Sequence, residues 1–277
     1  MRVIVANQAG VCFGVKRALD LVNAEAEKGE PLATLGPLIH NPQVVARLES
    51  KGVRVVRSVE AVESGAIVMP SHGVPREVVE SATGAGLTVI DATCPFVEKV
   101  HERVRALASD GYLVVVVGDA GHSEVKAIRS AAGDDAIVIS SADEADAVDW
   151  SGRNVGIVSQ TTQTPERFGE VVGRIAARAK EVVAYNTICY ATHDRQTAAR
   201  ELAPQVEAMF VVGGRNSANT NRLAEICEQA GVPTYHIETA AEIDEYCVRG
   251  MQTVGLTAGA STPEWIIEEV KAVLEAM

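Results

Sequence analysis

The chain has 277 residues, with 25 Lys and Arg against 37 Asp and Glu, so its formal net charge is −12. Its 47% apolar and 22% charged residues are typical of globular proteins and argue against a disordered chain. With 4% aromatic residues and no basic patch, the chain lacks the charge and the stacking side chains that nucleic-acid binding requires.

Neither a membrane segment nor a secretory signal is visible. The longest strongly apolar run, residues 112–117, is far shorter than the roughly 20 residues of a membrane-spanning helix. Residues 1–6 lead straight into a polar loop, without the longer apolar segment and the cleavage site of a signal peptide. Five widely spaced cysteines favour a reducing compartment over a disulfide framework. The sequence therefore predicts a cytoplasmic protein.

Short β-branched runs alternate with helical patterns along the whole chain, which predicts a parallel α/β fold. We predict strands near residues 2–6, 32–35, 53–56, 66–70, 87–90, 113–117, 136–139, 155–158, 182–185, 208–212, 234–237 and 253–256. One predicted helix starts at Cys94-Pro95 and ends before Gly111. Its expected buried face comprises Phe96, Val100, Val104 and Leu107.

Three cysteines occupy the same place in this pattern, after a strand and before a helix. They are Cys12, Cys94 and Cys189. A polar residue follows each cysteine by 28 positions: His40, His122 and Ser217, respectively. A further polar loop closes each unit: Ser71-His72-Gly73, residues 159–162 and residues 260–262. A βα unit of fixed length explains the interval but not the recurrence of ligating and anion-binding side chains. We infer three related α/β units whose loops converge.

Several of these loops begin helices. The predicted N-cap residues are Asn41, Ser123, Thr164 and Thr262. Each is followed by proline, except Ser123, which is followed by Glu124. Helix N-termini beyond the carboxyl ends of parallel strands bind anions through free N–H groups. A phosphate is expected on His40, His72, His122, Ser217, Asn219 and Ser261. No Walker loop and no G-x-G-x-x-G occurs, so a nucleotide is not indicated. His101 and His236 are assigned structural roles, and His193 stays open.

The cysteines divide into two groups. Cys227 and Cys247 are interpreted as small apolar residues, whereas the three cysteines at helix starts favour the thiolate. Three thiolates bind either zinc with one open position or an iron–sulfur cluster with one iron not ligated by protein. Three unrelated core cysteines are the alternative. Beside an open metal site, Glu124 would deliver protons, with Thr161 or Thr162 as a relay.

A series of motifs in chain order resembles the 4-hydroxy-3-methylbut-2-enyl diphosphate reductase family. The motifs are Cys12-x-Gly-Val-x-Arg-Ala18, Leu38-Ile-His-Asn41, Ser71-His-Gly-Val74, Asp91-Ala-Thr-Cys94-Pro95, Gly121-His-x-Glu124, Gln160-Thr-Thr162, Ile188-Cys-Tyr-Ala-Thr192, Asn216-Ser-x-Asn219 and Thr257-Ala-Gly-Ala-Ser261. Together they run from the first strand to the last loop. Two departures are Ala218, where many members have a second serine, and Ser159, where they have threonine.

The resemblance implies three parallel-sheet α/β units arranged as a pseudo-threefold cloverleaf around a central 4Fe–4S cluster. The implied units are residues 13–94, 95–188 and 189–277, with the strand in residues 1–12 packing on the third. The implied reaction is the two-electron reductive dehydroxylation of the allylic diphosphate to isopentenyl and dimethylallyl diphosphate. It is the final step of the non-mevalonate isoprenoid pathway.

By position, the resemblance makes Cys12, Cys94 and Cys189 the cluster ligands, and the fourth iron takes the substrate hydroxyl. The implied catalytic residues are Glu124, Thr161 and His122, and the diphosphate contacts are His40, His72, His122, Ser217, Asn219 and Ser261. Ferredoxin or flavodoxin is the expected electron donor. Two other hypotheses stay open: a zinc-dependent hydrolase of a small diphosphate, and a cluster-based redox sensor with a protein partner.

Overall fold

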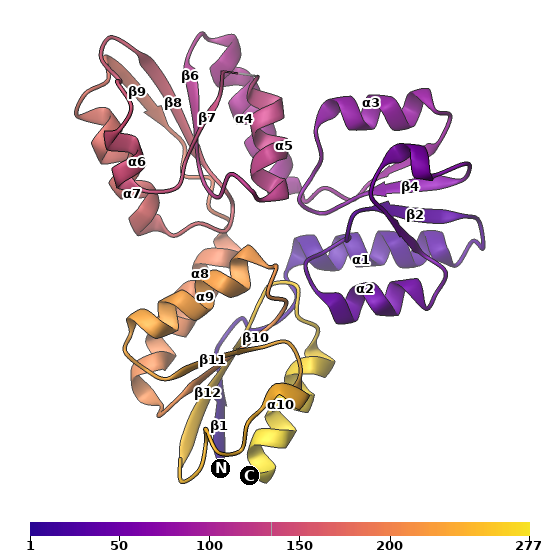
Figure 1. Ribbon diagram of the computed structural model, residues 1–277, viewed down its shortest axis with the longest axis vertical. Coiled ribbons are helices and arrows are strands. Elements are labelled where there is room, and N and C mark those ends of the chain that lie inside the picture. The colour runs from indigo at the N-terminus through magenta and orange to yellow at the C-terminus, as the bar shows by residue number, and fades with distance from the viewer. Residues whose placement is uncertain (134) are drawn as a thin grey trace. The chain divides into compact units, whose positions relative to one another are not determined.

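The computed structural model describes residues 1–133 and 135–277. Over these residues the chain folds into two compact units. The first unit comprises Met1–Lys16, Ile39–Ala46 and Tyr190–Met277, and the second comprises Arg17–Leu38 and Arg47–Cys189. Their strands form three four-stranded sheets with parallel pairing, one sheet in the first unit and two in the second (Figure 1).

The sheet of the first unit has the strand order β1-β12-β10-β11. Its strands are β1 (Arg2–Val5), β10 (Met209–Val212), β11 (Thr234–Ile237) and β12 (Thr253–Ala258). The helices of this part of the chain are α8 (Tyr190–Leu202), α9 (Ala218–Gln229) and α10 (Glu264–Ala276), with the short 3₁₀ turns Ala203–Gln205 and Ala240–Glu242.

The two sheets of the second unit have the orders β3-β2-β4-β5 and β7-β6-β8-β9. The strands are β2 (Leu32–Leu35), β3 (Arg54–Val56), β4 (Ala66–Met69), β5 (Thr88–Asp91), β6 (Leu113–Val117), β7 (Ile137–Ile139), β8 (Asn154–Ser159) and β9 (Glu181–Ala184). The helices are α1 (Phe13–Ala26), α2 (Pro42–Glu49), α3 (Arg76–Gly84), α4 (Pro95–Ser109), α5 (Ser123–Ala132), α6 (Ala142–Asp146) and α7 (Pro165–Ala176), with a 3₁₀ turn at Val59–Ala61. Helices α1 and α2 begin in residues of the first unit and continue into the second.

All three sheets have one topology. In the two sheets of the second unit, the first strand in sequence pairs with the second strand on one side and with the third on the other, and the fourth strand pairs with the third; β10, β11 and β12 pair in the same way as the first three strands. In the sheet of the first unit, β1 takes the place of the fourth strand, pairing with β12 from Arg2↔Thr253 to Val5↔Leu256. The strand order therefore reverses between β2 and β4, between β6 and β8, and between β10 and β12. Ligands of open α/β sheets bind beyond the carboxyl ends of the strands at such a switch point.

The continuous apolar strands are buried on both faces. Val115 and Val117 of β6 belong to a core cluster with Trp150, whereas Val114 and Val116 belong to the cluster on the opposite face. A parallel strand that is covered by helices on both sides has no solvent face, so its sequence does not alternate. The run that the sequence analysis identified as too short for a membrane helix is therefore the centre of a buried sheet.

The parallel α/β class and the three sheets are confirmed, and each predicted strand is present with ends shifted by at most two residues. Helix α4 also ends as predicted, because Gly111 has φ +80° and its N–H donates to the carbonyl of Ala108. Its predicted buried face is wrong at Phe96, since Val97 is buried and Phe96 is half-exposed beneath the Lys99 ammonium. The residue boundaries between the three units stay a prediction.

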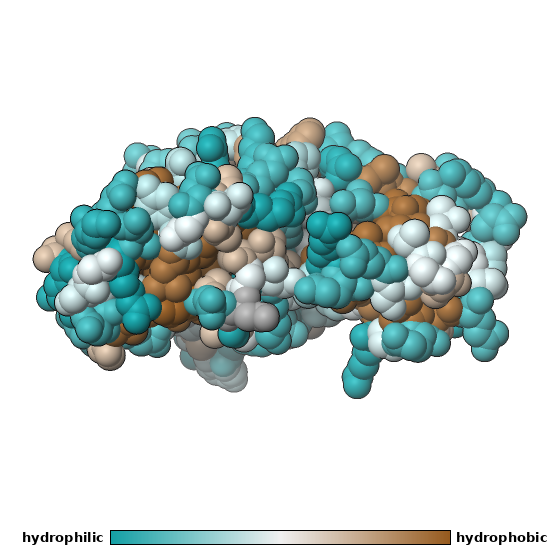
Figure 2. Space-filling view, turned by 90° about the horizontal axis from the view of Figure 1, so that it is seen from above, coloured by the Kyte–Doolittle hydropathy of each residue, from teal (hydrophilic) through white to brown (hydrophobic). Residues whose placement is uncertain are grey.

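Over residues 1–133 and 135–277, no helix combines the length and the apolarity that crossing a membrane requires. On the face drawn in Figure 2, hydrophilic residues predominate and apolar patches lie between them.

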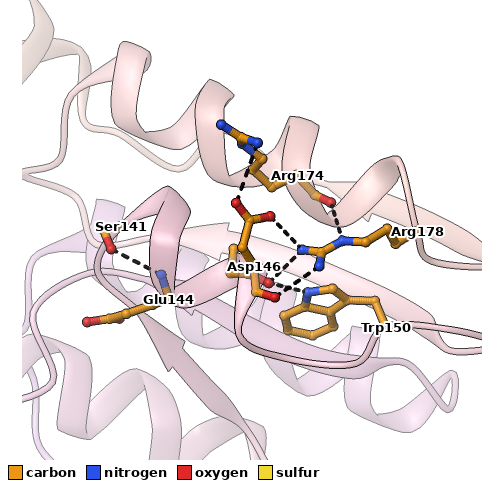
Figure 3. Close-up of polar contacts among 7 residues, drawn as sticks. Ser141, Glu144, Asp146, Trp150, Arg174 and Arg178 are labelled. Carbon is orange, nitrogen blue, oxygen red and sulfur yellow. Dashed lines mark hydrogen bonds and ion pairs between the residues drawn. The ribbon is translucent and has the colours of Figure 1, made fainter.

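The end of the short helix α6 is held by a guanidinium (Figure 3). Arg178 donates to the carbonyls of Ala145 at 2.7 Å and Asp146 at 3.1 Å, and it also pairs with the Asp146 carboxylate at 3.0 Å. The indole N–H of the fully buried Trp150 donates to the same Ala145 carbonyl at 2.7 Å. Arg178 therefore satisfies carbonyls at the helix end, where no intrahelical donor is available.

Replacing Arg178 with Ala is expected to lower the free energy of unfolding by about 1–2 kcal/mol, because two carbonyl hydrogen bonds are lost. Urea denaturation should show a lower midpoint with an unchanged slope. The matched control is Arg174→Ala, which removes only an exposed ion pair of 3.4 Å to Asp146 and should change stability by less than about 0.5 kcal/mol. Equal effects of the two substitutions would contradict the capping role.

Candidate functional site

Each of the three predicted ligand cysteines lies in the loop after the fourth strand of a sheet. Cys12 follows β1, Cys94 follows β5 and Cys189 follows β9. The residue after each cysteine is the first residue of a helix: α1, α4 and α8, respectively. All three cysteines are reduced and half-buried. Each loop therefore presents its cysteine sulfur at the N-terminus of a helix.

The backbone holds the three cysteines in the same way. The N–H of each cysteine donates to a carbonyl in the loop after the third strand of its own sheet. The acceptors are Ala260 for Cys12 at 3.0 Å, Ser71 for Cys94 at 2.9 Å and Thr161 for Cys189 at 3.0 Å. The cysteines therefore occupy equivalent positions in three sheets of one topology, as the repeat in the sequence indicated.

The side chains of the three cysteines are of the type that ligates iron–sulfur clusters. Among the described residues, no three His, Cys, Asp or Glu side chains gather closely enough to share one metal ion. Each thiolate of a cluster binds a different iron, so a cluster does not require such a group. Three half-buried thiols at helix starts supply the soft donors that iron–sulfur centres use.

Cys227 differs from these three. It is fully buried in the core of the first unit, and burial raises the pKa of its thiol to about 12. At neutral pH it stays a thiol and packs as a small apolar side chain, which is the structural role predicted for it. Cys247 is half-buried in a segment outside the helices and strands.

The carboxylate of Glu124 lies at the switch point of the second sheet in the second unit. Glu124 is in the first turn of α5, after β6, and Thr161 lies in the loop after the neighbouring strand β8. The Thr161 N–H donates to Glu124 Oε1 at 2.6 Å, and the Thr161 hydroxyl donates to Oε2 at 2.9 Å. The structure therefore brings together the predicted proton donor and its predicted relay.

Burial changes the acidity of this group. Glu124 is 4% exposed, and desolvation raises the pKa of its carboxyl to about 7, although both hydrogen bonds from Thr161 act in the opposite direction. A carboxyl with this pKa is partly protonated at neutral pH, as a general acid requires. A strongly perturbed carboxyl at the carboxyl ends of parallel strands indicates a functional site.

His72 and His122 lie near each other in the second unit, with ring centroids 6.5 Å apart and an interplanar angle of 72°. His122 precedes α5 and accepts a hydrogen bond from the N–H of Glu124 through Nδ1 at 3.1 Å. His72 is in a turn closed by the bond from the Gly73 N–H to the Pro70 carbonyl. One turn and one helix start therefore present two imidazoles beside the Glu124 segment.

The first unit holds the other predicted anion contacts. The Ser261 hydroxyl donates to the His40 carbonyl at 3.2 Å, and Ser217 caps α9 by accepting from the N–H of Thr220 at 3.3 Å. Burial lowers the pKa of His40, so its imidazole is neutral at pH 7. Asn219 is 4% exposed, and within the described residues neither amide atom has a hydrogen-bond partner. Because a buried amide without partners costs free energy, Asn219 points to a polar ligand.

The predicted site residues thus fall into two groups. The first unit contains Cys12, His40, Ser217, Asn219 and Ser261, and the second contains Cys94, Cys189, His72, His122, Glu124 and Thr161. Of the other histidines, His101 is buried in α4 and His236 lies in β11, as their structural assignment predicted, and His193 is exposed on α8.

Two of the four predicted helix caps are confirmed. Asn41 Oδ1 accepts from the N–H of Val44 at the start of α2, and Thr164 caps α7. The prediction for Ser123 is wrong, because α5 begins at Ser123 itself, one residue earlier than predicted, and its N-cap is His122. Thr262 is wrong as well, since its buried hydroxyl donates to the Val212 carbonyl and Pro263 precedes α10.

The sequence analysis missed Gly214, which brings the loop after β10 against the His40 loop. An ideal Cβ on Gly214 would lie 2.5 Å from the His40 carbonyl oxygen, closer than any real contact. Two adjacent glycines after a buried strand, Gly213-Gly214, were the available signal for such a close backbone approach. Thr162 was left as an alternative relay, and it occupies the loop position that His72 and Ser261 occupy in the other two sheets.

Replacing Gly214 with Ala is expected to raise KM about tenfold or more, because the His40 backbone must move to accept the methyl group. The iron content should stay at the wild-type level. The measurement is steady-state kinetics of the anaerobic protein with the allylic diphosphate that the sequence resemblance implies. The matched control is Gly173→Ala, at an exposed glycine of α7 whose Cβ would meet no atom within 4 Å and whose φ, like that of Gly214, is not positive. An equal rise in KM in this variant would contradict the role of Gly214.

Comparisons with known proteins extend over nearly the whole chain. The model of the LytB protein family matches residues 3–275. The 4-hydroxy-3-methylbut-2-enyl diphosphate reductase of Pelobacter propionicus is 50% identical over 270 residues, which cover 98% of this chain and 96% of the relative. The protein of the same name from Geobacter sp. strain M21 is 51% identical over 271 residues, covering 98% and 95%.

Two solved structures have the same fold. One is (E)-4-hydroxy-3-methyl-but-2-enyl diphosphate reductase, the terminal enzyme of the non-mevalonate pathway, with a TM-score of 0.70, 44% identity and coverage of 100% of both chains. The other is E-1-hydroxy-2-methyl-but-2-enyl-4-diphosphate reductase from Plasmodium falciparum, with a TM-score of 0.93, 26% identity and coverage of 99% of this chain and 87% of that chain. Because the family match and the identity to these relatives extend from the first strand to the last helix, this chain belongs to the LytB family, the family of the 4-hydroxy-3-methylbut-2-enyl diphosphate reductases.

Proposed function

We propose that this chain reduces 4-hydroxy-3-methylbut-2-enyl diphosphate to isopentenyl and dimethylallyl diphosphate, the terminal step of the non-mevalonate pathway. The observation that carries the proposal is the buried Glu124 carboxyl, held by Thr161 and with a pKa raised to about 7, in a chain with three equivalent cysteine loops. The names of the relatives and of the solved structures support the same reaction.

The proposed cofactor is one 4Fe–4S cluster ligated by Cys12, Cys94 and Cys189. When bound, such a cluster supplies electrons singly and offers the substrate hydroxyl one iron that no protein side chain ligates. The equivalent positions of the three cysteines at helix starts support this ligand set. The alternative, a zinc-dependent hydrolase, would use the same three thiols, and metal analysis distinguishes it from the reductase.

The diphosphate is proposed to bind two sets of residues, one in each unit. The set of the first unit is His40, Ser217, Asn219 and Ser261, and that of the second is His72 and His122. Imidazoles, hydroxyls, an amide and the N-terminus of α9 are hydrogen-bond donors that hold an anion without a cluster of lysines or arginines. Ala218, the first residue of α9, removes one hydroxyl relative to many family members, but its backbone N–H remains near the helix start.

The reaction consumes two electrons and two protons. The bond between carbon and the hydroxyl oxygen breaks, and this oxygen leaves as water after it receives one proton. Glu124 is proposed to donate that proton, with the Thr161 hydroxyl orienting the carboxyl and His122 lying beside it. The allylic fragment takes the second proton at carbon and becomes one of the two products. A small electron-transfer protein, ferredoxin or flavodoxin, is the proposed source of the electrons, in a cytoplasmic setting.

Analysis of the anaerobically purified protein tests the proposal. We expect iron with inorganic sulfide, and formation of isopentenyl and dimethylallyl diphosphate from the allylic diphosphate with a chemical reductant. Zinc without sulfide, together with release of inorganic phosphate, would instead support the hydrolase. A cluster-containing protein that forms no product would overturn the reductase and favour the redox sensor.

A further inference from the structure

The loop that carries Cys12 is built differently from the loops that carry Cys94 and Cys189. Three residues before Cys94, Asp91 Oδ1 accepts a hydrogen bond from the N–H of Thr93 at 2.8 Å. Three residues before Cys189, Asn186 Oδ1 accepts from the N–H of Ile188 at 3.1 Å. In both loops a short polar side chain therefore fixes the backbone immediately before the cysteine.

The equivalent position before Cys12 is Ala9, whose methyl group cannot accept a hydrogen bond. The backbone of this loop is also unusual. Gln8 has φ +65°, in the left-handed region that costs free energy for a residue with a Cβ, and Gly10 has φ +104°. A loop with these conformations and without the local side-chain bond needs another contact to hold it.

Arg195 supplies such a contact from the first unit. It lies on the buried face of α8 with Thr192, Gln196 and Ala199, and only 4% of its surface is exposed. Its Nη2 donates to the carbonyl of Gly10 at 2.6 Å, and its Nη1 donates to the carbonyl of Ala191 at 2.6 Å. One planar guanidinium thus ties the residue two positions before Cys12 to a rigid helix.

Gly10 also lies close to a side chain of α10. An ideal Cβ on Gly10 would lie 3.2 Å from Ile267 Cδ1 on α10. The next fixed point along the loop is the bond from the Cys12 N–H to the Ala260 carbonyl. Arg195 therefore adds a contact to a loop that also contacts α10 and the segment after β12.

We propose that Arg195 is a positioning residue for Cys12, which holds the Cys12 loop in its ligating conformation and replaces the side-chain bond that Asp91 and Asn186 make in the other two loops. The proposal rests on the proposed role of Cys12 as a cluster ligand. Groups that orient metal ligands without touching the metal typically change metal affinity by about 10–100-fold when they are removed. Arg195 belongs to this class.

The test compares Arg195→Gln with Arg200→Gln, which removes the same charge from an exposed position of the same helix. The full-length proteins are purified anaerobically, and cluster loss to an excess of iron chelator is followed by the thiolate-to-iron absorption. Arg195→Gln is expected to lose its cluster about 10–100-fold faster than wild type, whereas Arg200→Gln should match wild type. Equal rates for Arg195→Gln and Arg200→Gln would overturn the proposal.

A rescue variant separates positioning from a general loss of stability. Adding Ala9→Asn to Arg195→Gln installs the side chain that Asn186 provides before Cys189. The double variant is expected to lose its cluster at least about tenfold more slowly than Arg195→Gln alone. If Arg195→Gln folds poorly, Arg195→Lys keeps the charge but not the two-pronged geometry, and it should give an intermediate rate of loss. If a folded double variant loses its cluster as fast as Arg195→Gln, the proposal that Arg195 replaces a side-chain bond of the Asn186 type is contradicted.

The Cys12→Ser variant distinguishes this inference from the proposed function. Loss of the cluster in Cys12→Ser, with full retention in Arg195→Gln, would refute only the role of Arg195. Full retention of the cluster in Cys12→Ser would refute Cys12 as a ligand, and with it the proposed cluster site.

Discussion

Replacing Glu124 with Gln is expected to lower turnover of the allylic diphosphate by about 10²–10⁴-fold while the iron and sulfide contents stay at wild-type levels. Gln has nearly the same shape as protonated Glu and can keep the bond from the Thr161 N–H, and the Thr161 hydroxyl can turn to accept from its amide. It has no acidic proton to give to the leaving hydroxyl. The measurement is anaerobic turnover together with iron and sulfide analysis of the same preparation.

The matched control is Glu77→Gln, which removes an exposed carboxylate that accepts from the Ser130 hydroxyl. It should leave turnover unchanged. A Glu124→Gln variant that reduces the substrate at the wild-type rate would show that another group donates the proton. A variant that loses both turnover and iron would show that Glu124 supports the centre instead of the chemistry.

The raised pKa of Glu124 gives this assignment a pH signature. The folded protein binds the proton more tightly than the unfolded chain, so Glu124 adds stability below its ordinary pKa of 4.5, and this contribution is lost as the pH rises through about 7. Turnover should also fall as the pH rises through about 7, because the protonated carboxyl is the proposed proton donor. In Glu124→Gln the stability loss between pH 4.5 and 7 should disappear. Urea denaturation across this range, with wild type and Glu77→Gln in parallel, measures it.

Equivalent loop positions in the three sheets hold different polar side chains. Beyond the third strand of each sheet, the same loop position holds His72, Thr162 and Ser261. The loop after the first strand holds His40, His122 or Ser217, each at or near a helix start. One topology thus repeats a hydrogen-bonding position while the side chain changes, and only the sheet of β6 and β8 adds a buried carboxyl among these predicted site residues.

The strands and the repeated loops could be predicted because their signals are local. Apolar β-branched runs mark buried parallel strands, and Asn41 or Thr164 before a proline marks a helix start. The failures have physical causes too. His122 caps α5 in place of Ser123, because its imidazole Nδ1 accepts from the Glu124 N–H. Thr262 does not cap α10, because its hydroxyl donates instead to the carbonyl of Val212.

Long-range contacts could not be predicted from the pattern. Arg195 reads as a polar residue on an ordinary helix, and its partner Gly10 is 185 residues away in sequence. The pKa of Glu124 follows from burial and from Thr161, 37 residues along the chain, which residue type alone does not reveal. The close approach of Gly214 to His40 is likewise a tertiary contact, for which the glycine pair is only a weak local sign.

Replacing any one of Cys12, Cys94 or Cys189 with Ser is expected to abolish the proposed 4Fe–4S cluster and to lower turnover by at least about 100-fold. Serine keeps the size and the backbone N–H bond of each cysteine, but its hydroxyl is not deprotonated at neutral pH and is a poor ligand for iron in a sulfide cluster. Each loop supplies one sulfur from an equivalent position, so the loss should be similar for all three. Iron, sulfide and the thiolate-to-iron absorption of the anaerobic proteins are the measurements.

Cys247→Ser is the matched control, because Cys247 is half-buried like the three proposed ligands but lies outside the equivalent loops. It should retain iron, sulfide and turnover. A low yield of cluster in all four variants would point to general instability, and circular dichroism of the iron-free proteins would then show lost structure. Because serine conserves the loop geometry, a cluster that persists in the Cys94→Ser protein would mean that the sulfur of Cys94 is not a ligand, and the threefold logic of the site would fail at that residue.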